Sequence, residues 1–473
     1  MLATRWTDVR LPTHHPDMLV LRVRKSAARI ARLLARDPAR ARTQAPGLYA
    51  LHRLELAGKL HQAQPLGSRA RRRAARAARY GDLKAGLLAA AGEHDQRRPN
   101  TAHLLVHLHE PRQRAALHRA LRRDPHVAAV AKVPTRYLSA ANPTDGLLPP
   151  ERMWNHARIQ LGEARRLKEF RSTRNIRVAV LDSGVQTHHP SLRGRVHQYV
   201  HRWAPLHQSK TSAKDIVGHG THISGIINAA HDRTLGIEGI ASCRLTVMKV
   251  FDDRLDATGI AGTKVFLVNP LFYRWSLEEC FARRFHAVNL SLGGPAPPDP
   301  HEAALLRGML RNGTVIVAAM GNALKQRSQP AYPAAFPGVI AVGAVGPDDV
   351  VAPFSRRGPH LALCAPGVAI WSTLPTFPGE FGFVQGDVPG DRRSKRRPLA
   401  RNTHYDAWPG TSGACPHVTA AVALLLASRG RLTPAQVKTL LQRSADRVPG
   451  MHGKRFDPSY GAGRLNLRRL LKG

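Results

Sequence analysis

The sequence has few cysteines and few aromatic side chains for its length. Only 4 of its 473 residues are cysteine and only 5% are aromatic. No two cysteines are close enough to form a C-x-x-C pair, which would indicate a metal or redox site. A chain of this size does not need disulfides for stability. Three of the cysteines stand in apolar segments, which favours buried free thiols: Cys243, Cys364 and Cys415.

Long hydrophobic runs are also absent. No apolar stretch approaches the roughly 20 residues of a membrane-spanning helix, and the N-terminus lacks the apolar core of a signal peptide. These absences predict a soluble, cytoplasmic protein, unless export uses another route or the start codon is misassigned. The composition, with 43% hydrophobic and 22% charged residues, is that of a globular chain.

Acidic residues are scarce relative to basic ones. There are 32 of them against 72 Lys and Arg, so the formal net charge is +40. Residues 1–150 contain 28 basic and 10 acidic side chains, and residues 151–473 contain 44 and 22. Such an even excess does not indicate one nucleic-acid-binding module, although non-specific affinity for acidic partners follows from it. The basic run at 69–79 is interpreted as a solvated helical surface or linker.

Before residue 142 the pattern predicts a small α+β domain over 18–141, preceded by a tail at 1–17. Alternating and helix-periodic segments predict strands at 18–24, 48–60, 102–109 and 126–137, and helices at 25–37 and 111–123. A long basic insert is expected at about 61–101, with residues 88–101 as a loop. The Pro-rich segment 142–150 is interpreted as a linker, and the main domain boundary is placed there.

After the linker the pattern becomes α/β, over 142–473. Continuous apolar strands alternate with helical segments, which predicts a doubly wound, mainly parallel sheet with helices on both faces. The predicted strands are 176–181, 245–251, 287–292, 314–319 and 339–345, and the predicted helices are 220–230, 277–284, 301–311, 418–427 and 433–446. The Gly/Pro-rich segment 376–409 predicts an exposed insertion. In such sheets chemistry sits at the carboxyl ends of the strands.

The stretch Gly410-Thr-Ser412-Gly413 comes just before a predicted buried helix. A serine at a helix start between glycines suits a nucleophile, because small neighbours admit a substrate and the helix N-terminus favours developing negative charge. The same residues also suit an ordinary turn and helix cap. Two upstream stretches decide between these interpretations.

Asp182 ends a predicted buried strand, and His219 stands at a glycine-flanked helix start. A serine hydroxyl is a poor nucleophile until a base takes its proton, and the base needs a partner that fixes its tautomer. Ser412, His219 and Asp182 supply these roles. A zinc site at His219 and His222 is disfavoured, because the glutamate of an H-E-x-x-H motif is missing. His222 is therefore predicted to be a packed, hydrogen-bonded helix histidine.

These three stretches resemble the signature blocks of the subtilisin-like serine peptidases (subtilases), in the same chain order of Asp, His and Ser. Further blocks follow the family order, at 288–295, 317–322, 332–345 and 354–367. The resemblance covers roughly residues 146–470. It implies a subtilisin-like fold and a serine endopeptidase that hydrolyses peptide or protein substrates without a cofactor.

The resemblance also implies roles for single residues. Ser412 would be the nucleophile, His219 the general base and then acid, and Asp182 its orienting partner. Asn322 and the backbone N–H of Ser412 would form the oxyanion hole. The primary specificity pocket would be lined by Ser291, Leu292, Gly293, Gly294, Ala318, Ala319, Met320 and Gly321, with Ala331 at its floor. None of these is acidic, so apolar or uncharged side chains are expected to be preferred over basic ones.

The N-terminal unit is similar to the inhibitory propeptide of the family. The resemblance implies an intramolecular inhibitor whose tail, 135–141, enters the active site. Self-cleavage is expected within 137–146.

Some positions depart from the family pattern. Ser191 replaces a carboxylate, and Arg233 an asparagine, at the best-known calcium site of the family. A cation beside an arginine is disfavoured, so no metal is expected there. Gly413 and Cys415 are unusual but remove no catalytic group. Two alternatives stay open: an inactive subtilase that acts as a binding module, and a basic nucleic-acid-associated protein.

Overall fold

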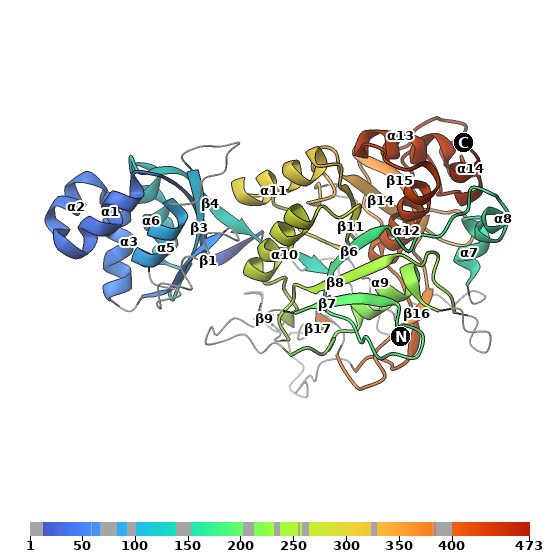
Figure 1. The fold of residues 1–473 in the computed structure, drawn as a ribbon, viewed down its shortest axis with the longest axis horizontal. Helices are drawn as coiled ribbons and strands as arrows, with labels where there is room; N and C mark the ends of the chain where they lie inside the picture. Colours follow the sequence, from blue (N-terminus) through green and yellow to red (C-terminus); the bar gives the residue numbers. More distant parts are fainter. Residues whose placement is uncertain are drawn as a thin grey trace, which may run out of the picture.

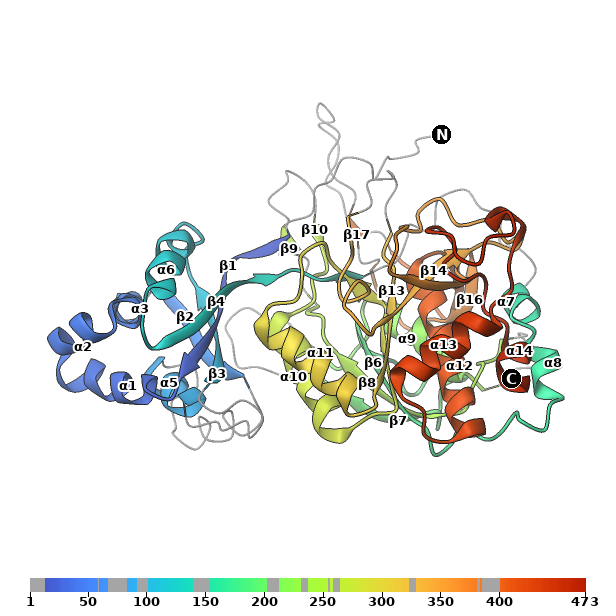
Figure 2. The same ribbon diagram turned by 90° about the horizontal axis from the view of Figure 1, so that it is seen from above.

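The computed structural model describes residues 13–57, 59–66, 83–91, 101–138, 153–201, 212–230, 237–253, 256–257, 264–322, 329–380, 383–384 and 400–473. They form a small N-terminal unit and a larger α/β unit, which lie side by side (Figure 1). Figure 2 shows the last long strand of the small unit running towards the larger one.

The small unit is an antiparallel sheet covered by helices on one face. Its described strands lie in the order β2-β3-β1-β4. They are β1 (His14–Arg24), β2 (Leu60–Leu66), β3 (Thr101–Leu108) and β4 (Val127–Pro134). The helices pack together on the face away from the α/β unit: α1 (Ala27–Arg36), α2 (Pro38–Gln44), α3 (Pro46–Leu56), α5 (Leu83–Ala91) and α6 (Gln113–Arg122). The predicted α+β class is confirmed.

Strand β1 is apolar on both faces, and each face has its own partner. Leu19 and Leu21 pack under the helices of the small unit. Val20 points the other way and packs on Phe272 and Trp275 of the α/β unit. Successive side chains of a strand point to opposite faces of a sheet, so this continuous apolar run places the sheet between two layers.

Three expectations for this unit were wrong. Residues 48–60 are not a strand but mostly helix α3, where Leu48 and Leu51 are buried at helical spacing after Pro46 at the first helical position. The expected insert at 61–101 supplies strand β2 and helix α5, so residues 88–91 are not a loop. Strand β1 also begins at His14, inside the expected tail. The basic run 69–79 lies outside the described residues.

The larger unit has a seven-stranded parallel sheet within the described residues. The order is β15-β14-β13-β11-β6-β8-β7, and every pairing is parallel. The strands are β6 (Arg177–Asp182), β7 (Val196–Val200), β8 (Arg244–Lys249), β11 (Ala287–Leu290), β13 (Val315–Ala319), β14 (Ile340–Val345) and β15 (Leu361–Pro366).

Helices cover both faces of this sheet, as expected for a doubly wound fold. One apolar core contains residues of α9 (His219–Asn228), α12 (Thr411–Arg429), α13 (Pro434–Ser444) and α14 (Leu467–Lys472). The other contains residues of α10 (Pro270–Arg283) and α11 (Pro300–Arg311). Val178 and Val180 of β6 belong to the first core, and Ala179 and Leu181 to the second. Two short helices, α7 (Trp154–Arg158) and α8 (Leu161–Arg165), precede the sheet.

Helix α12 runs through the centre of the α/β unit. It is long and apolar enough to cross a membrane, which the sequence reading did not anticipate, but 89% of its most apolar window is buried inside the protein. It therefore serves here as a core helix. The following helix α13 begins at a capping box, in which the Thr433 hydroxyl accepts from Gln436 N at 3.2 Å.

The expected exposed insertion at 376–409 is wrong at its C-terminal end. Strand β18 (Tyr405–Trp408) pairs antiparallel with β16 (Ile370–Thr373). Arg401 is buried, with its guanidinium donating to backbone carbonyl oxygens that include that of Ile216. This segment therefore packs against the loop that precedes α9. The basic run 391–397 lies outside the described residues.

Candidate active site

Asp182 and His219 meet where strand β6 ends and helix α9 begins. His219 Nδ1 lies 2.7 Å from Asp182 Oδ1, and both side chains are almost fully buried. His219 Nε2 has no hydrogen-bond partner among the described residues. A Cβ on Gly220 would overlap the carbonyl oxygen of Gly184, so glycine is needed to bring the helix this close. The carboxylate thus orients an imidazole whose other nitrogen can act as a base.

A second buried carboxylate, Asp215, fixes both loops and was not among the predicted site residues. Its Oδ1 accepts from the Ser183 hydroxyl at 2.8 Å and from Gly218 N at 2.9 Å. Its Oδ2 accepts from the backbone N–H and the hydroxyl of Thr221. Ser183 follows Asp182, and Gly218 precedes His219. The sequence offered one signal for it: Asp215 is an acidic residue that directly precedes the apolar pair Ile216 and Val217, four positions before His219.

Ser412 lies in the first turn of α12. The backbone carbonyl of Ser412 would normally accept from the N–H of residue 416, but Pro416 has none. The Ser291 hydroxyl donates to this carbonyl instead, at 2.9 Å. Gly410, with φ of 149° and ψ of 151°, turns the chain into the helix. The serine therefore lies at the positive end of a 19-residue helix.

Asn322 follows strand β13 and is held by the residue next to Ser412. Its Oδ1 accepts from the backbone N–H of Thr411 at 3.1 Å and from the Thr411 hydroxyl at 2.8 Å. The Thr411 hydroxyl is also close to Gly321 N, at 3.1 Å. Because the carbonyl end of the amide is fixed in this way, its Nδ2 donor end is directed away from Thr411.

The segments predicted to line the primary pocket adjoin one another. Strand β12 (Leu292–Gly293) follows β11, and Gly294 pairs with Tyr332 through two backbone hydrogen bonds. A Cβ on Gly321 would lie 3.1 Å from the Cβ of Ala331. The remaining predicted residues are buried at the end of β11 and along the end of β13: Ser291, Ala318, Ala319 and Met320. These segments are neighbours in the fold, and their role as the lining of a specificity pocket stays a prediction.

The chain leaving the small unit pairs with this same strand. Strand β5 (Tyr137–Leu138) is antiparallel to β12, with Leu138 opposite Leu292 and Tyr137 opposite Gly293. On the other side, Tyr137 forms an antiparallel bridge with Leu267. The segment is therefore held between strand β12 and Leu267 of the α/β unit. Residues 139–152, which contain most of the expected cleavage region, lie outside the described residues.

A buried arginine fixes the start of that segment. Arg136 forms an ion pair with Glu302 of α11, with Nη2 2.9 Å from Oε2, and both side chains are 2% exposed. Its Nη1 also donates to the carbonyl oxygen of Ala296. The Tyr273 hydroxyl donates to the other oxygen of Glu302. This network joins the two units in addition to the apolar contacts of β1.

Other candidate residues have structural partners. His222 Nε2 lies 2.9 Å from the carbonyl oxygen of Ile370, and its ring stacks on Trp408 at a centroid distance of 5.2 Å. Burial lowers the pKa of His222 to about 3, so it is a neutral, packed helix histidine as predicted. All four cysteines are buried and free. Burial raises the pKa of the Cys415 thiol to about 12, so it is no nucleophile despite its place near Ser412.

The calcium prediction is only partly addressed by the structure. The Ser191 hydroxyl lies 2.8 Å from the Tyr405 hydroxyl, and Arg233 lies outside the described residues. No group of three or more His, Cys, Asp or Glu that could hold a metal occurs in the described ranges. The absence of calcium at this position stays a prediction.

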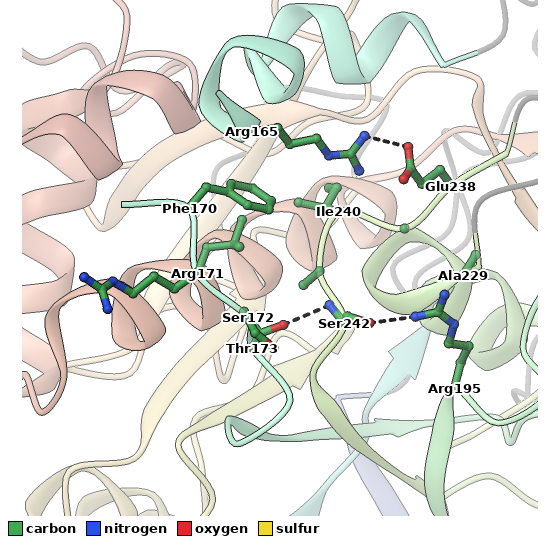
Figure 3. Close-up of a pocket in the computed structure, with 13 residues that line it drawn as sticks. Arg165, Phe170, Arg171, Ser172, Thr173, Arg195, Ala229, Glu238, Ile240 and Ser242 are labelled. Atoms are coloured by element: carbon green, nitrogen blue, oxygen red, sulfur yellow. Dashed lines mark hydrogen bonds and ion pairs between the residues drawn. The ribbon is translucent and has the colours of Figure 1, made fainter. Parts of the chain in front are cut away.

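A cavity of about 430 Å³ lies on another part of the α/β unit (Figure 3). Its lining includes two arginines with partners: Arg165 donates to Glu238, and Arg195 donates to the Ser242 hydroxyl. None of the predicted catalytic residues lines it. It is therefore separate from the candidate active site.

A parallel α/β sheet that presents an Asp–His pair at one strand end and a serine at the start of its central helix defines the subtilisin-like class of folds. The sequence profile described as the subtilase family matches residues 173–463. The chain belongs to the subtilase family.

Subtilisin E from Bacillus subtilis is 33% identical over 298 residues, which cover 62% of this chain and 65% of that protein. Subtilisin from Bacillus pumilus is also 33% identical, over 62% of this chain and 90% of that protein. The chain thus spans just under two thirds of subtilisin E. The crystal structure of fervidolysin from Fervidobacterium pennivorans, a keratinolytic enzyme related to subtilisin, matches with a TM-score of 0.60 and 22% identity, covering 99% of this chain and 62% of that one.

Proposed function

We propose that this protein is a serine endopeptidase that hydrolyses peptide bonds through an acyl-enzyme. The observation that carries the proposal is the buried His219–Asp182 pair, with Nδ1 bonded at 2.7 Å and Nε2 without a partner among the described residues. Such a pair can take the proton of a serine hydroxyl and stabilise the imidazolium that forms. Membership of the subtilase family supports the same reaction.

In this proposal Ser412 attacks the scissile carbonyl and His219 acts first as base, then as acid for the leaving amine. The Nδ2 of Asn322 and the backbone N–H of Ser412 stabilise the oxyanion. In subtilisin, loss of the corresponding donor costs about 100–1000-fold in kcat. The uncharged lining formed by residues 291–294, 318–321 and Ala331 disfavours basic side chains before the scissile bond.

The small unit is proposed to be an intramolecular inhibitor. Strand β5 occupies the edge of β12, where an extended substrate would add as a strand. The Arg136–Glu302 ion pair and the apolar contact of β1 with α10 support tight docking. Self-cleavage is expected within 137–146, in or just after the segment that pairs with β12.

A fluorophosphonate probe tests the activity. Wild type is expected to be labelled, and Ser412→Ala is not. Mass spectrometry of the same two samples tests the inhibitor role, because a cut within 137–146 should appear in wild type alone. If wild type is neither labelled nor cut, the chain is an inactive subtilase serving as a binding module, and the peptidase proposal is wrong.

A further inference from the structure

Arg356 carries a positive charge to one end of the proposed primary pocket. Its backbone N–H donates to the carbonyl oxygen of Gly321 at 3.0 Å. A Cβ placed on Gly321 would lie 3.1 Å from Cδ and 3.3 Å from Nε of Arg356, and 3.1 Å from the Cβ of Ala331. The guanidinium stem therefore lies where two of the proposed pocket walls meet.

One hydrogen bond fixes the head of this side chain. Nη1 of Arg356 donates to the carbonyl oxygen of Gln329 at 2.7 Å, two residues before Ala331. A guanidinium has five N–H donors in a planar fork. The contact to Gln329 uses one of them, so the guanidinium is held beside the pocket floor with donors to spare among the described contacts.

The charge of Arg356 has no carboxylate partner among the described residues. Burial lowers the pKa of Arg356, and no neighbouring charge contributes to that shift. Residues 323–328, which lie outside the described residues, contain no acidic side chain in the sequence. A half-buried charge without a partner is unfavourable, so a carboxylate that arrives with a substrate would be stabilised here.

We propose that Arg356 makes the primary pocket select peptides with an acidic side chain, glutamate above all, before the scissile bond. The proposal rests on the peptidase function and names its substrate class. The methylene groups of glutamate would lie against the uncharged walls formed by 291–294 and 318–321. Its carboxylate would pair with the fork of Arg356, which matches carboxylate geometry. This refines the expectation of an uncharged preference drawn from the lining residues alone.

Four peptide p-nitroanilides that differ only in the residue before the scissile bond test the proposal: Glu, Gln, Leu and Lys. Glutamate and glutamine have nearly the same shape, so the ratio of their kcat/KM values isolates the charge. The wild-type ratio is expected to be about tenfold or more in favour of Glu, the scale of a charge-assisted hydrogen bond. In Arg356→Gln the ratio should fall towards one. Arg356→Lys should be intermediate, since it keeps the charge without the fork.

Arg357→Gln is the matched control. It removes the same charge from the next residue and should keep the wild-type ratio. A Glu:Gln ratio near one in wild type would overturn the proposal without any variant, so a folding defect in Arg356→Gln cannot protect it. An undiminished ratio in Arg356→Gln would overturn it as well. Failure to cleave any of the four peptides, together with no fluorophosphonate labelling of Ser412, would refute the peptidase function itself.

Discussion

Acidification is expected to loosen the small unit from the α/β unit, because neutral histidines are buried between them. His15 of β1 is buried, and burial lowers its pKa to about 3. Arg274 of α10 and Arg136 also lower it, whereas Asp17 acts in the opposite direction. The ring of His103, from β3, lies 4.8 Å from that of His301 on α11. Burial and the neighbouring His301 hold the pKa of His103 well below its usual range.

The direction of the pH effect on docking depends on whether the docked or the undocked state binds more protons. A histidine exposed by undocking has a pKa near 6.5 and takes up a proton at pH 5, whereas docked His15 stays neutral. Docking is therefore fully stabilised above about pH 6.5 and weakens progressively as the pH falls towards 3. At pH 5 His15 alone would weaken docking by about 2 kcal/mol, a factor of roughly 30. Protonation of His103 acts in the same direction.

Hydrogen exchange of amides that bond across the two units measures this change. Val268 N–H donates to the carbonyl oxygen of Arg136 at 3.1 Å. In uncut Ser412→Ala, its protection is expected to fall about 30-fold or more between pH 7.5 and pH 5, after correction for intrinsic exchange. The double variant His15→Gln, His103→Gln should lose most of this pH dependence. The exposed His452→Gln is the matched control.

Core amides of α12 separate undocking from general acid unfolding, since buried histidines of the α/β unit also have lowered pKa values. If the α12 amides lose protection as much as Val268, the loss is global and the reasoning is wrong. Equal protection of Val268 at both pH values would refute it too.

Three further outcomes are expected. Asp215→Asn places an amide NH2 group opposite N–H and O–H donors, so it should lower the free energy of unfolding by about 2 kcal/mol and reduce kcat. Thermal unfolding measures the loss of stability, and kinetics with a titrated active-site concentration measure kcat. Arg136→Gln leaves Glu302 buried without its ion-pair partner and should weaken docking of the small unit by about 3 kcal/mol. Faster labelling of Ser412 by the fluorophosphonate probe would show this, and the matched control Arg112→Gln, at an exposed arginine, should have no effect. Chelation with EDTA should leave the Tm unchanged, because Ser191 supplies no carboxylate to a cation; a clear drop would contradict this.

The candidate catalytic residues could be selected from the sequence because each stands in a short glycine-bearing stretch that needs no tertiary information. Asp182 ends an apolar strand, His219 starts a helix between glycines, and Ser412 precedes a continuous apolar helix. The five inner strands of the parallel sheet were predicted for a similar reason, since burial on both faces makes them continuously apolar. Both edge strands were missed. Strand β7 has exposed and half-buried residues and lacks that signal, whereas β15 is buried throughout and was missed although its sequence is apolar.

The residues that surround this site could not be found in the same way. Arg356 reaches Gly321 and Gln329, which are 35 and 27 positions away, and Arg136 reaches Glu302 across 166 positions. No local pattern encodes such pairs. Helix α3 was mistaken for a strand because its leucines and aromatics fit either period over a short window. Residues 48–56 are helical because they pack in the layer of helices over the sheet of the small unit, and a local sequence pattern does not show that packing.

The placement of β5 connects the predictions about docking with those about specificity. If a substrate adds to β12 as proposed, it must replace Tyr137 and Leu138 on the same strand edge, so substrate binding and docking would exclude one another. Loss of the Arg136 ion pair should therefore raise the apparent kcat/KM of all peptides by a common factor and leave the Glu:Gln ratio unchanged. A change at Arg356 should instead alter the Glu:Gln ratio. Measuring the four peptides with Arg136→Gln and with Arg356→Gln thus separates control of access to β12 from selection of the substrate side chain.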